Sequence, residues 1–138
     1  MRKTSFATLG MLALLAAASA FAQQRMTVDI PFGFHAGTNI VPAGRYEVTQ
    51  LSLVSGLTAI ACDACGVDVR VLTNPGADNN EPTQGELVFN KYGDEYFLST
   101  VRSPGSYVAR VLPISKVESE AAHSASLTPT TTILLARR

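Results

Sequence analysis

Two cysteines are the residues of this 138-residue chain with the clearest reactive chemistry. Cys62 and Cys65 stand in a Cys-Asp-Ala-Cys sequence, the spacing found in thiol–disulfide oxidoreductases. Those enzymes place the pair at a helix N-terminus, where the helix dipole stabilises a thiolate. Here β-type runs and Gly66 surround the pair. The sequence therefore predicts a structural role, with a disulfide that closes a hairpin as the favoured state and two buried thiols as the alternative.

Zinc binding is the second chemistry that these cysteines allow. His35 and His123 could complete a tetrahedral site with Cys62 and Cys65. No second pair of ligands has metal-type spacing, however, and a lone histidine at a strand end or in a tail is more often solvated. The sequence also lacks a nucleophile elbow, a Walker loop and a dinucleotide-binding glycine loop. We therefore predict a protein that is not an enzyme and has no catalytic residue, metal or cofactor.

The N-terminal segment has the composition of an export signal. It begins with Arg2 and Lys3, continues as a mostly apolar run over residues 6–18 and ends in a small-x-small sequence at 20–22. A transmembrane anchor is the alternative, but it needs roughly 20 apolar residues. We expect cleavage after Ala22 and a periplasmic or extracellular location, where disulfides persist.

Charge argues against polyanionic partners. The chain contains 11 Lys and Arg and 11 Asp and Glu, and removal of Arg2 and Lys3 leaves nine basic residues against eleven acidic ones. Nucleic acids and anionic membrane surfaces select for clusters of Lys and Arg. The readable strands are about six to eight residues long, shorter than the roughly 9–11 residues of a membrane-spanning strand. The mature chain is expected to be soluble, to bind no nucleic acid and not to insert into a membrane.

Glycines recur after the signal at intervals of mostly eight to twelve residues, with short β-type runs between them. This spacing is typical of a small sandwich or barrel. We predict an all-β fold, a single small antiparallel sandwich or barrel of about seven strands with a short C-terminal helix and tail. The predicted division is a signal peptide at 1–22, an all-β domain at 23–123 and a Ser/Thr/Pro-rich tail at 124–138.

Alternation of apolar and polar residues sets the expected strands. Pro31 lacks the N–H that a central strand needs, so the first strand is expected at an edge or with a bulge. Ser115 and Glu118 have the spacing of a capping box, which predicts a helix. Residues 73–84 are turn-rich and expected to form a loop, whereas Ile133–Ala136 could be a last strand or remain loose. The expected elements are strands at 27–34, 45–51, 57–62, 67–72, 86–91, 95–102 and 107–112 and a helix at 115–123.

Aromatic residues on these strands are suited to fill one small core. Each would contribute about 1.5–3 kcal/mol when fully buried. Core packing is favoured over a ligand-binding aromatic strip because large aromatic side chains are mostly buried. The six residues are Phe32, Phe34, Tyr46, Phe89, Tyr96 and Phe97.

Four sequence segments occur in an order that resembles an uncharacterised family of small exported bacterial β-proteins. They are Pro31-Phe32-Gly33-Phe34, Val41-Pro42-Ala43-Gly44-Arg45-Tyr46-Glu47-Val48, Leu87-Val88-Phe89-Asn90-Lys91-Tyr92-Gly93-Asp94-Glu95-Tyr96-Phe97-Leu98 and Leu112-Pro113-x-Ser115-Lys116. The resemblance implies an exported β-domain with a tight Tyr-Gly-Asp hairpin. It implies no activity, ligand or catalytic residue. Cys62 and Cys65 depart from the family pattern.

These features favour a non-catalytic binding or assembly module of the cell envelope. Its expected partner is another envelope protein, a surface polymer or a second copy of the chain, received at an unpaired strand edge in 27–34 or 130–136. The alternative is an envelope thiol–disulfide or metal-handling protein that uses Cys62 and Cys65. A third possibility is a carrier of a small apolar ligand, if the strands enclose a hollow barrel.

Overall fold

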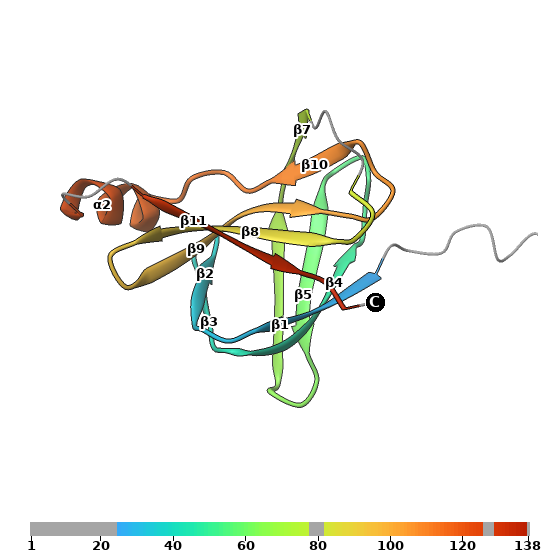
Figure 1. Cartoon of the computed structure of the whole chain (residues 1–138), viewed down its shortest axis with the longest axis horizontal. Helices are drawn as coiled ribbons and strands as arrows, with labels where there is room; N and C mark the ends of the chain where they lie inside the picture. The colour runs from blue at the N-terminus through green and yellow to red at the C-terminus, as the bar shows by residue number, and fades with distance from the viewer. Residues whose placement is uncertain (1–24, 78–81, 126–128, 138) are drawn as a thin grey trace, which may run out of the picture.

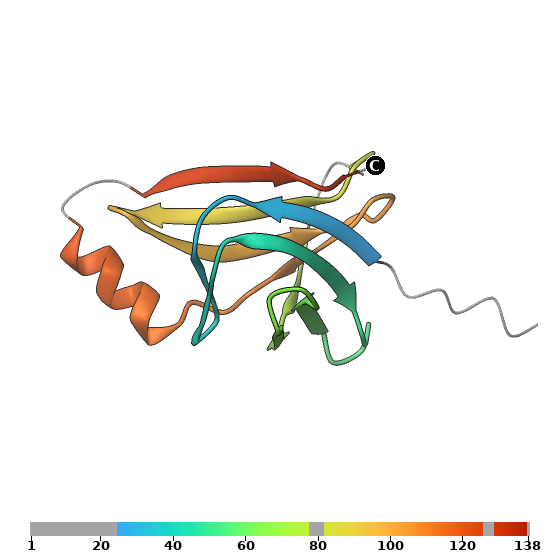
Figure 2. The same cartoon turned by 90° about the horizontal axis from the view of Figure 1, so that it is seen from below.

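Two β-sheets pack face to face in the computed structural model, which describes residues 25–77, 82–125 and 129–137 (Figures 1 and 2). The arrangement is an antiparallel sandwich and not a closed barrel. The all-β prediction is therefore confirmed, and of the two predicted architectures the structure has the sandwich. Helix α2 (Lys116–Ser124) lies beside the turn that joins β8 and β9 (Figure 2). The expected signal peptide at 1–22 lies outside the described residues.

The first sheet has four strands in the order β1-β4-β5-β6. β5 and β6 have the predicted bounds, and Gly66 supplies the positive φ of +67° that their tight turn requires. β1 is an edge strand, as Pro31 predicted, and it ends before that proline. The bounds are β1 (Arg25–Ile30), β4 (Gly44–Gln50), β5 (Leu57–Cys62) and β6 (Val67–Leu72).

The second sheet has the order β11-β8-β9-β10-β7, and the hairpin β2–β3 joins it where β2 runs parallel to β9. The described residues hold eleven strands against about seven predicted. The four additional strands are β2, β3, β7 and β11. The bounds are β2 (Phe34–Ala36), β3 (Asn39–Val41), β7 (Asn74–Ala77), β8 (Glu86–Tyr92), β9 (Glu95–Arg102), β10 (Val108–Val111) and β11 (Thr130–Leu135).

β6 and β7 form one nearly continuous strand that passes from the first sheet to the second (Figure 1). Only Thr73 separates them, and its buried N–H and hydroxyl both donate to the carbonyl of Gly56, at 3.0 and 2.7 Å. The loop prediction for 73–84 is therefore wrong over Asn74–Ala77. A Pro-Gly pair is tolerated there because β7 lies at the edge of its sheet. Residues 78–81 lie outside the described part of the chain.

Aromatic side chains fill the space between the sheets, as predicted. Phe34, Tyr46 and Phe89 are buried, and the Phe34 ring meets the other two in T-shaped contacts at 5.9 and 5.2 Å between centroids. Phe32 and Tyr96 stack at 3.8 Å on the border of this core. Such contacts add about 0.5–1.5 kcal/mol each to the burial of the rings.

Phe97 is buried but does not belong to that core. Its ring stacks on His35 at 4.4 Å and meets Tyr92 at 5.7 Å. Its cross-strand partner Asn90 is hydrogen-bonded to Glu118 of α2. Phe97 therefore lies on the outer face of the second sheet, the face turned away from the first sheet. A β-bulge in the β8–β9 pair contributes to this outcome, because it shifts which residues of β9 face the core.

Helix α2 begins where the sequence predicts. Ser115 is the N-cap, and its hydroxyl accepts a hydrogen bond from the backbone N–H of Glu118 at 3.1 Å. The Glu118 carboxylate accepts from Asn90 Nδ2 at 3.2 Å and from Tyr92 Oη at 3.3 Å. This side chain therefore fixes the helix to the outer face of the second sheet, and Glu118 is only 5% exposed.

The last strand settles the alternative left open by the sequence. The segment from Thr130 to Leu135 forms β11, which pairs along its length with β8 in the second sheet. The sequence predicts a tail at 124–138, but residues 130–135 of it form an edge strand of the second sheet. In the part of the chain that the structure describes, no helix has the length and apolar character needed to cross a membrane.

Candidate functional site

The cysteine pair forms a disulfide at the tip of the β5–β6 hairpin. The two Cα atoms are 5.2 Å apart, Cys62 is buried and Cys65 is exposed. The N–H of Cys65 donates to Cys62 Sγ at 3.1 Å. Strands flank the pair on both sides, so no helix dipole acts on either sulfur. The predicted disulfide is thus found, in a hairpin context that differs from the helix N-terminus of thiol–disulfide oxidoreductases.

The two histidines lie in different surroundings. His35 stacks on Phe97 and places Nε2 3.8 Å from Glu95 Oε1, whereas His123 is exposed in the last turn of α2. Within residues 25–77, 82–125 and 129–137, no three His, Cys, Asp or Glu side chains are grouped to hold a metal ion. The structure therefore does not bring the candidate zinc ligands together.

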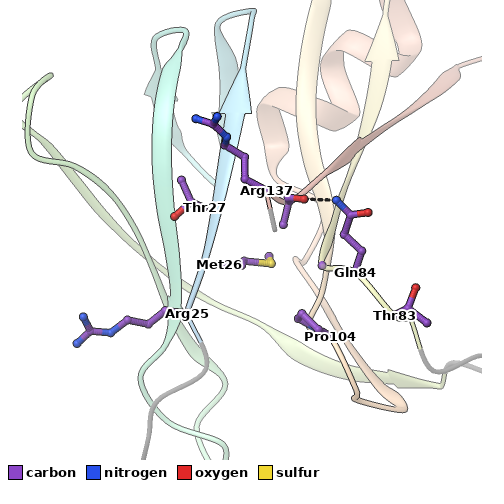
Figure 3. Close-up of a pocket in the computed structure, with 9 residues that line it drawn as sticks. Arg25, Met26, Thr27, Thr83, Gln84, Pro104 and Arg137 are labelled. Carbon is purple, nitrogen blue, oxygen red and sulfur yellow. Dashed lines mark hydrogen bonds between the residues drawn. The ribbon is translucent and has the colours of Figure 1, made fainter.

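A cavity of about 430 Å³ lies at the corner where β1 begins and β11 ends (Figure 3). Two backbone hydrogen bonds form this corner, from Ala136 N–H to Gly85 O at 2.7 Å and from Arg137 N–H to Thr27 O at 2.8 Å. The Gln84 side-chain amide also donates to the carbonyl of Ala136. The cavity is lined by Arg25, Met26, Thr27, Thr83, Gln84, Gly85, Pro104, Ala136 and Arg137.

The two arginines at this cavity are already paired with carboxylates. Arg25 Nη1 lies 3.6 Å from Glu47, and Figure 3 shows its side chain directed away from Met26. Arg137 Nε lies 3.7 Å from Asp29, which also accepts a 2.7 Å hydrogen bond from Arg45. The hydrogen bond from Arg45, with the positive charges of Arg45 and Arg137, lowers the pKa of Asp29. Each arginine that lines the cavity thus has a carboxylate partner, and neither is a free cation.

Strand β11 has an edge without the usual protection against pairing. It forms a ladder with β8 on one side and is the last strand of its sheet on the other. Its sequence, Thr-Thr-Thr-Ile-Leu-Leu, has no charge, proline or glycine. Ile133 and Leu135 are 52% and 56% exposed. Both point to the outer face, because the intervening Leu134 packs on the core.

Other edge strands of the described chain each carry a protective feature. β1 has Arg25 and Asp29, β6 has Asp68 and Arg70, and β7 has Pro75. β3 has only three residues. Charges, prolines and short length are the devices by which natural sheets avoid edge-to-edge association. Among the edge strands that the structure describes, β11 is the one that has six residues and carries neither a charged residue nor a proline.

An apolar row extends from β11 across the outer face of the second sheet. Ile133 pairs with Val88, Val88 with Thr100, and Thr100 with Val111. Ile133 and Val111 are exposed, and Val88 and Thr100 are half-buried. The edge of β11 therefore continues into an apolar surface that reaches β10.

Two of these features were not predicted from the sequence. The corner cavity depends on the meeting of four chain segments that are distant in the sequence, for which no local signal exists. The Glu118 contacts with Asn90 and Tyr92 were missed because the capping-box spacing explained Glu118 by itself. The sequence indicates 130–136 and 27–34 as candidate edges, and in the structure the strands of these two segments, β11 and β1, lie beside each other.

No family model, curated protein or solved structure matches this chain.

Proposed function

We propose that the chain is an exported, non-catalytic binding or assembly module of the cell envelope, and that the edge of β11 is its contact surface. The observation that carries this proposal is the unprotected six-residue edge of β11. Of the other edge strands in the described residues, β1, β6 and β7 carry charges or a proline, and β3 has only three residues. The N-terminal segment supports the export that the proposal requires.

An extended strand of a partner can add to such an edge. Its main chain supplies hydrogen bonds to the unpaired N–H and C=O groups, and its side chains give specificity. Ile133 and Leu135 supply exposed apolar contacts on the outer face. Binding of this kind needs no catalytic group, which agrees with the lack of a motif for acyl transfer, phosphate binding or metal chemistry in the sequence.

Site-specific photocrosslinking in the native envelope tests the proposal. A photoreactive amino acid replaces Thr131, which is exposed on β11, and as a matched control it replaces Arg70, which is exposed on the guarded edge β6. We expect adducts of discrete mass from position 131 and none from position 70. Equal labelling from both positions, or none from position 131, contradicts a binding edge at β11.

A second candidate function rests on the exposure of Cys65. A disulfide at an exposed hairpin tip can exchange with an external thiol, as an envelope thiol–disulfide protein would require. Replacement of Cys62 and Cys65 by Ser separates the two candidates. The binding module keeps its crosslinks at position 131 in this variant, whereas a thiol–disulfide protein loses all activity.

A further inference from the structure

We propose that the partner received at the β11 edge is β11 of a second copy of this chain, in antiparallel orientation. The second sheets of the two copies then form one continuous sheet across a twofold axis. This inference rests on the proposed function and names its partner. Two observations support the inference: the distribution of charge along β11, and the part of the β11 edge that makes no hydrogen bond to β1.

Charge favours the antiparallel orientation. Thr130–Leu135 has no charged residue, so two copies can approach without burying an unpaired charge. Arg137 follows the strand and is exposed. A parallel pair would place the two Arg137 side chains next to each other. An antiparallel pair places them at opposite ends, about 30 Å apart for a separation of ten residues.

The free part of the edge sets the register. Arg137 N–H is bonded to Thr27 O, so the C-terminal end of the edge already faces β1. Pairing is therefore restricted to about Thr130–Leu134, whose midpoint is Thr132. With Thr132 on the twofold axis, Thr131 of one copy lies opposite Ile133 of the other.

This register also keeps the two faces of the sheet consistent. Thr131 and Ile133 both point to the outer face, and Thr132 and Leu134 are half-buried toward the first sheet. A shift by one residue would place an outward side chain opposite an inward one. The proposed pair joins the apolar rows that run from Ile133 to Val111 in each copy.

The interface is small, so a reversible dimer in the micromolar range is expected and not a permanent one. Sedimentation velocity over a roughly hundredfold range of concentration is the measurement. The chain is expressed with its own residues 1–22 and purified after export. We expect the sedimentation coefficient to rise with concentration from monomer to dimer.

Charge substitutions on β11 give the decisive test. The variant T131K/I133K places Lys opposite Lys in the proposed register, and it should raise the dissociation constant roughly tenfold or more. T131E/I133E should do the same. An equimolar mixture of the two should restore the dimer, because Lys then lies opposite Glu. Restoration of this kind is not expected from variants that merely fail to fold.

The chain offers a matched control on the β2–β3 hairpin. Thr38 and Ile40 have the same residue types at the same spacing, and both are exposed. T38K/I40K adds equal charge elsewhere and should dimerise like the unsubstituted chain. Loss of the dimer in T38K/I40K as well, or no restoration in the mixture, overturns the self-pairing.

The failure of this inference is distinguishable from the failure of the proposed function. A chain that is monomeric at every concentration, yet forms adducts at position 131 with a different protein, refutes self-pairing and leaves the binding module standing. A monomeric chain with no adduct at position 131 refutes both.

Discussion

The backbone N–H of Arg137 donates a 2.8 Å hydrogen bond to the carbonyl of Thr27, and this bond joins the end of the second sheet to the edge of the first. The sandwich is therefore closed at one corner by main-chain atoms that lie 110 positions apart in the sequence. The same bond leaves the rest of the β11 edge open, which connects the closure of the fold to the proposed contact surface.

Gly85 is required at this corner because of space. A Cβ added there would lie 2.5 Å from Met26 Sδ and 3.1 Å from the Cβ of Ala136. We expect Gly85→Ala to lower the free energy of unfolding by about 1–3 kcal/mol, measured by urea denaturation. Gly33→Ala is the control, since its new Cβ would meet only the Val41 carbonyl, at 3.6 Å. An equal loss in both variants would contradict a steric role for the corner.

Glu118 should be the most important side chain for holding α2 on the sheet. Its replacement by Ala leaves Asn90 Nδ2 and Tyr92 Oη without their carboxylate, and we expect a loss of about 1–3 kcal/mol. Glu120 is exposed and has only a 3.9 Å ion pair with Lys116, so Glu120→Ala should cost less than about 0.5 kcal/mol. Urea denaturation followed by circular dichroism compares the two; similar losses would refute the anchoring role.

Stability should fall at alkaline pH because of two tyrosines. Burial raises the pKa of Tyr46, and burial together with the negative charge of Glu118 raises that of Tyr92. In the unfolded chain both ionise near pH 10. Above that pH the folded state holds more protons than the unfolded state, so the free energy of unfolding decreases as pH rises through the folded pKa values.

Urea midpoints between pH 8 and pH 11 test this dependence. The double variant Y46F/Y92F removes both hydroxyls and should flatten the alkaline decrease, while it lowers stability at pH 8 through the lost hydrogen bonds to Pro42 O and Glu118. An unchanged alkaline slope in the double variant would assign the decrease to other groups.

The disulfide should contribute modestly to stability. It closes a loop of only four residues, for which the chain-entropy estimate is about 2 kcal/mol. Reduction is thus expected to lower the urea midpoint while the β-type circular dichroism at low urea persists. The C62S/C65S variant should show the same midpoint with and without reductant. Complete unfolding on reduction would indicate that the bridge has a larger structural role.

Local patterns were sufficient for much of the fold. The bounds of β5 and β6 were predicted to the residue because both β-type runs lie within one short segment. Ser115 likewise located the start of α2. In each case the information needed is present within a few residues of the feature.

Features that depend on distant segments were not predicted. Asn74-Pro75-Gly76 has strong turn chemistry, but β10 lies alongside and provides a ladder, so an edge strand forms. The six aromatics share one β-type character, yet the Phe97 ring lies on the outer face against His35 and Tyr92, and the bulge that contributes to this cannot be read from the sequence of β9. The sequence predicted the candidate contact edge only in part. The sequence indicated 130–136 as a candidate edge but left open whether it forms a strand, whereas its pairing with β8 and its place at the end of the second sheet required the structure.

The passage of one strand through Thr73 into both sheets has a consequence for cooperativity. Because only the buried Thr73 separates β6 from β7, one sheet cannot move far from the other without disturbing either the β5–β6 pair or the β10–β7 pair. Opening of one sheet is therefore coupled to opening of the other, and the slowest amide protons of both sheets should exchange with solvent through one common unfolding event.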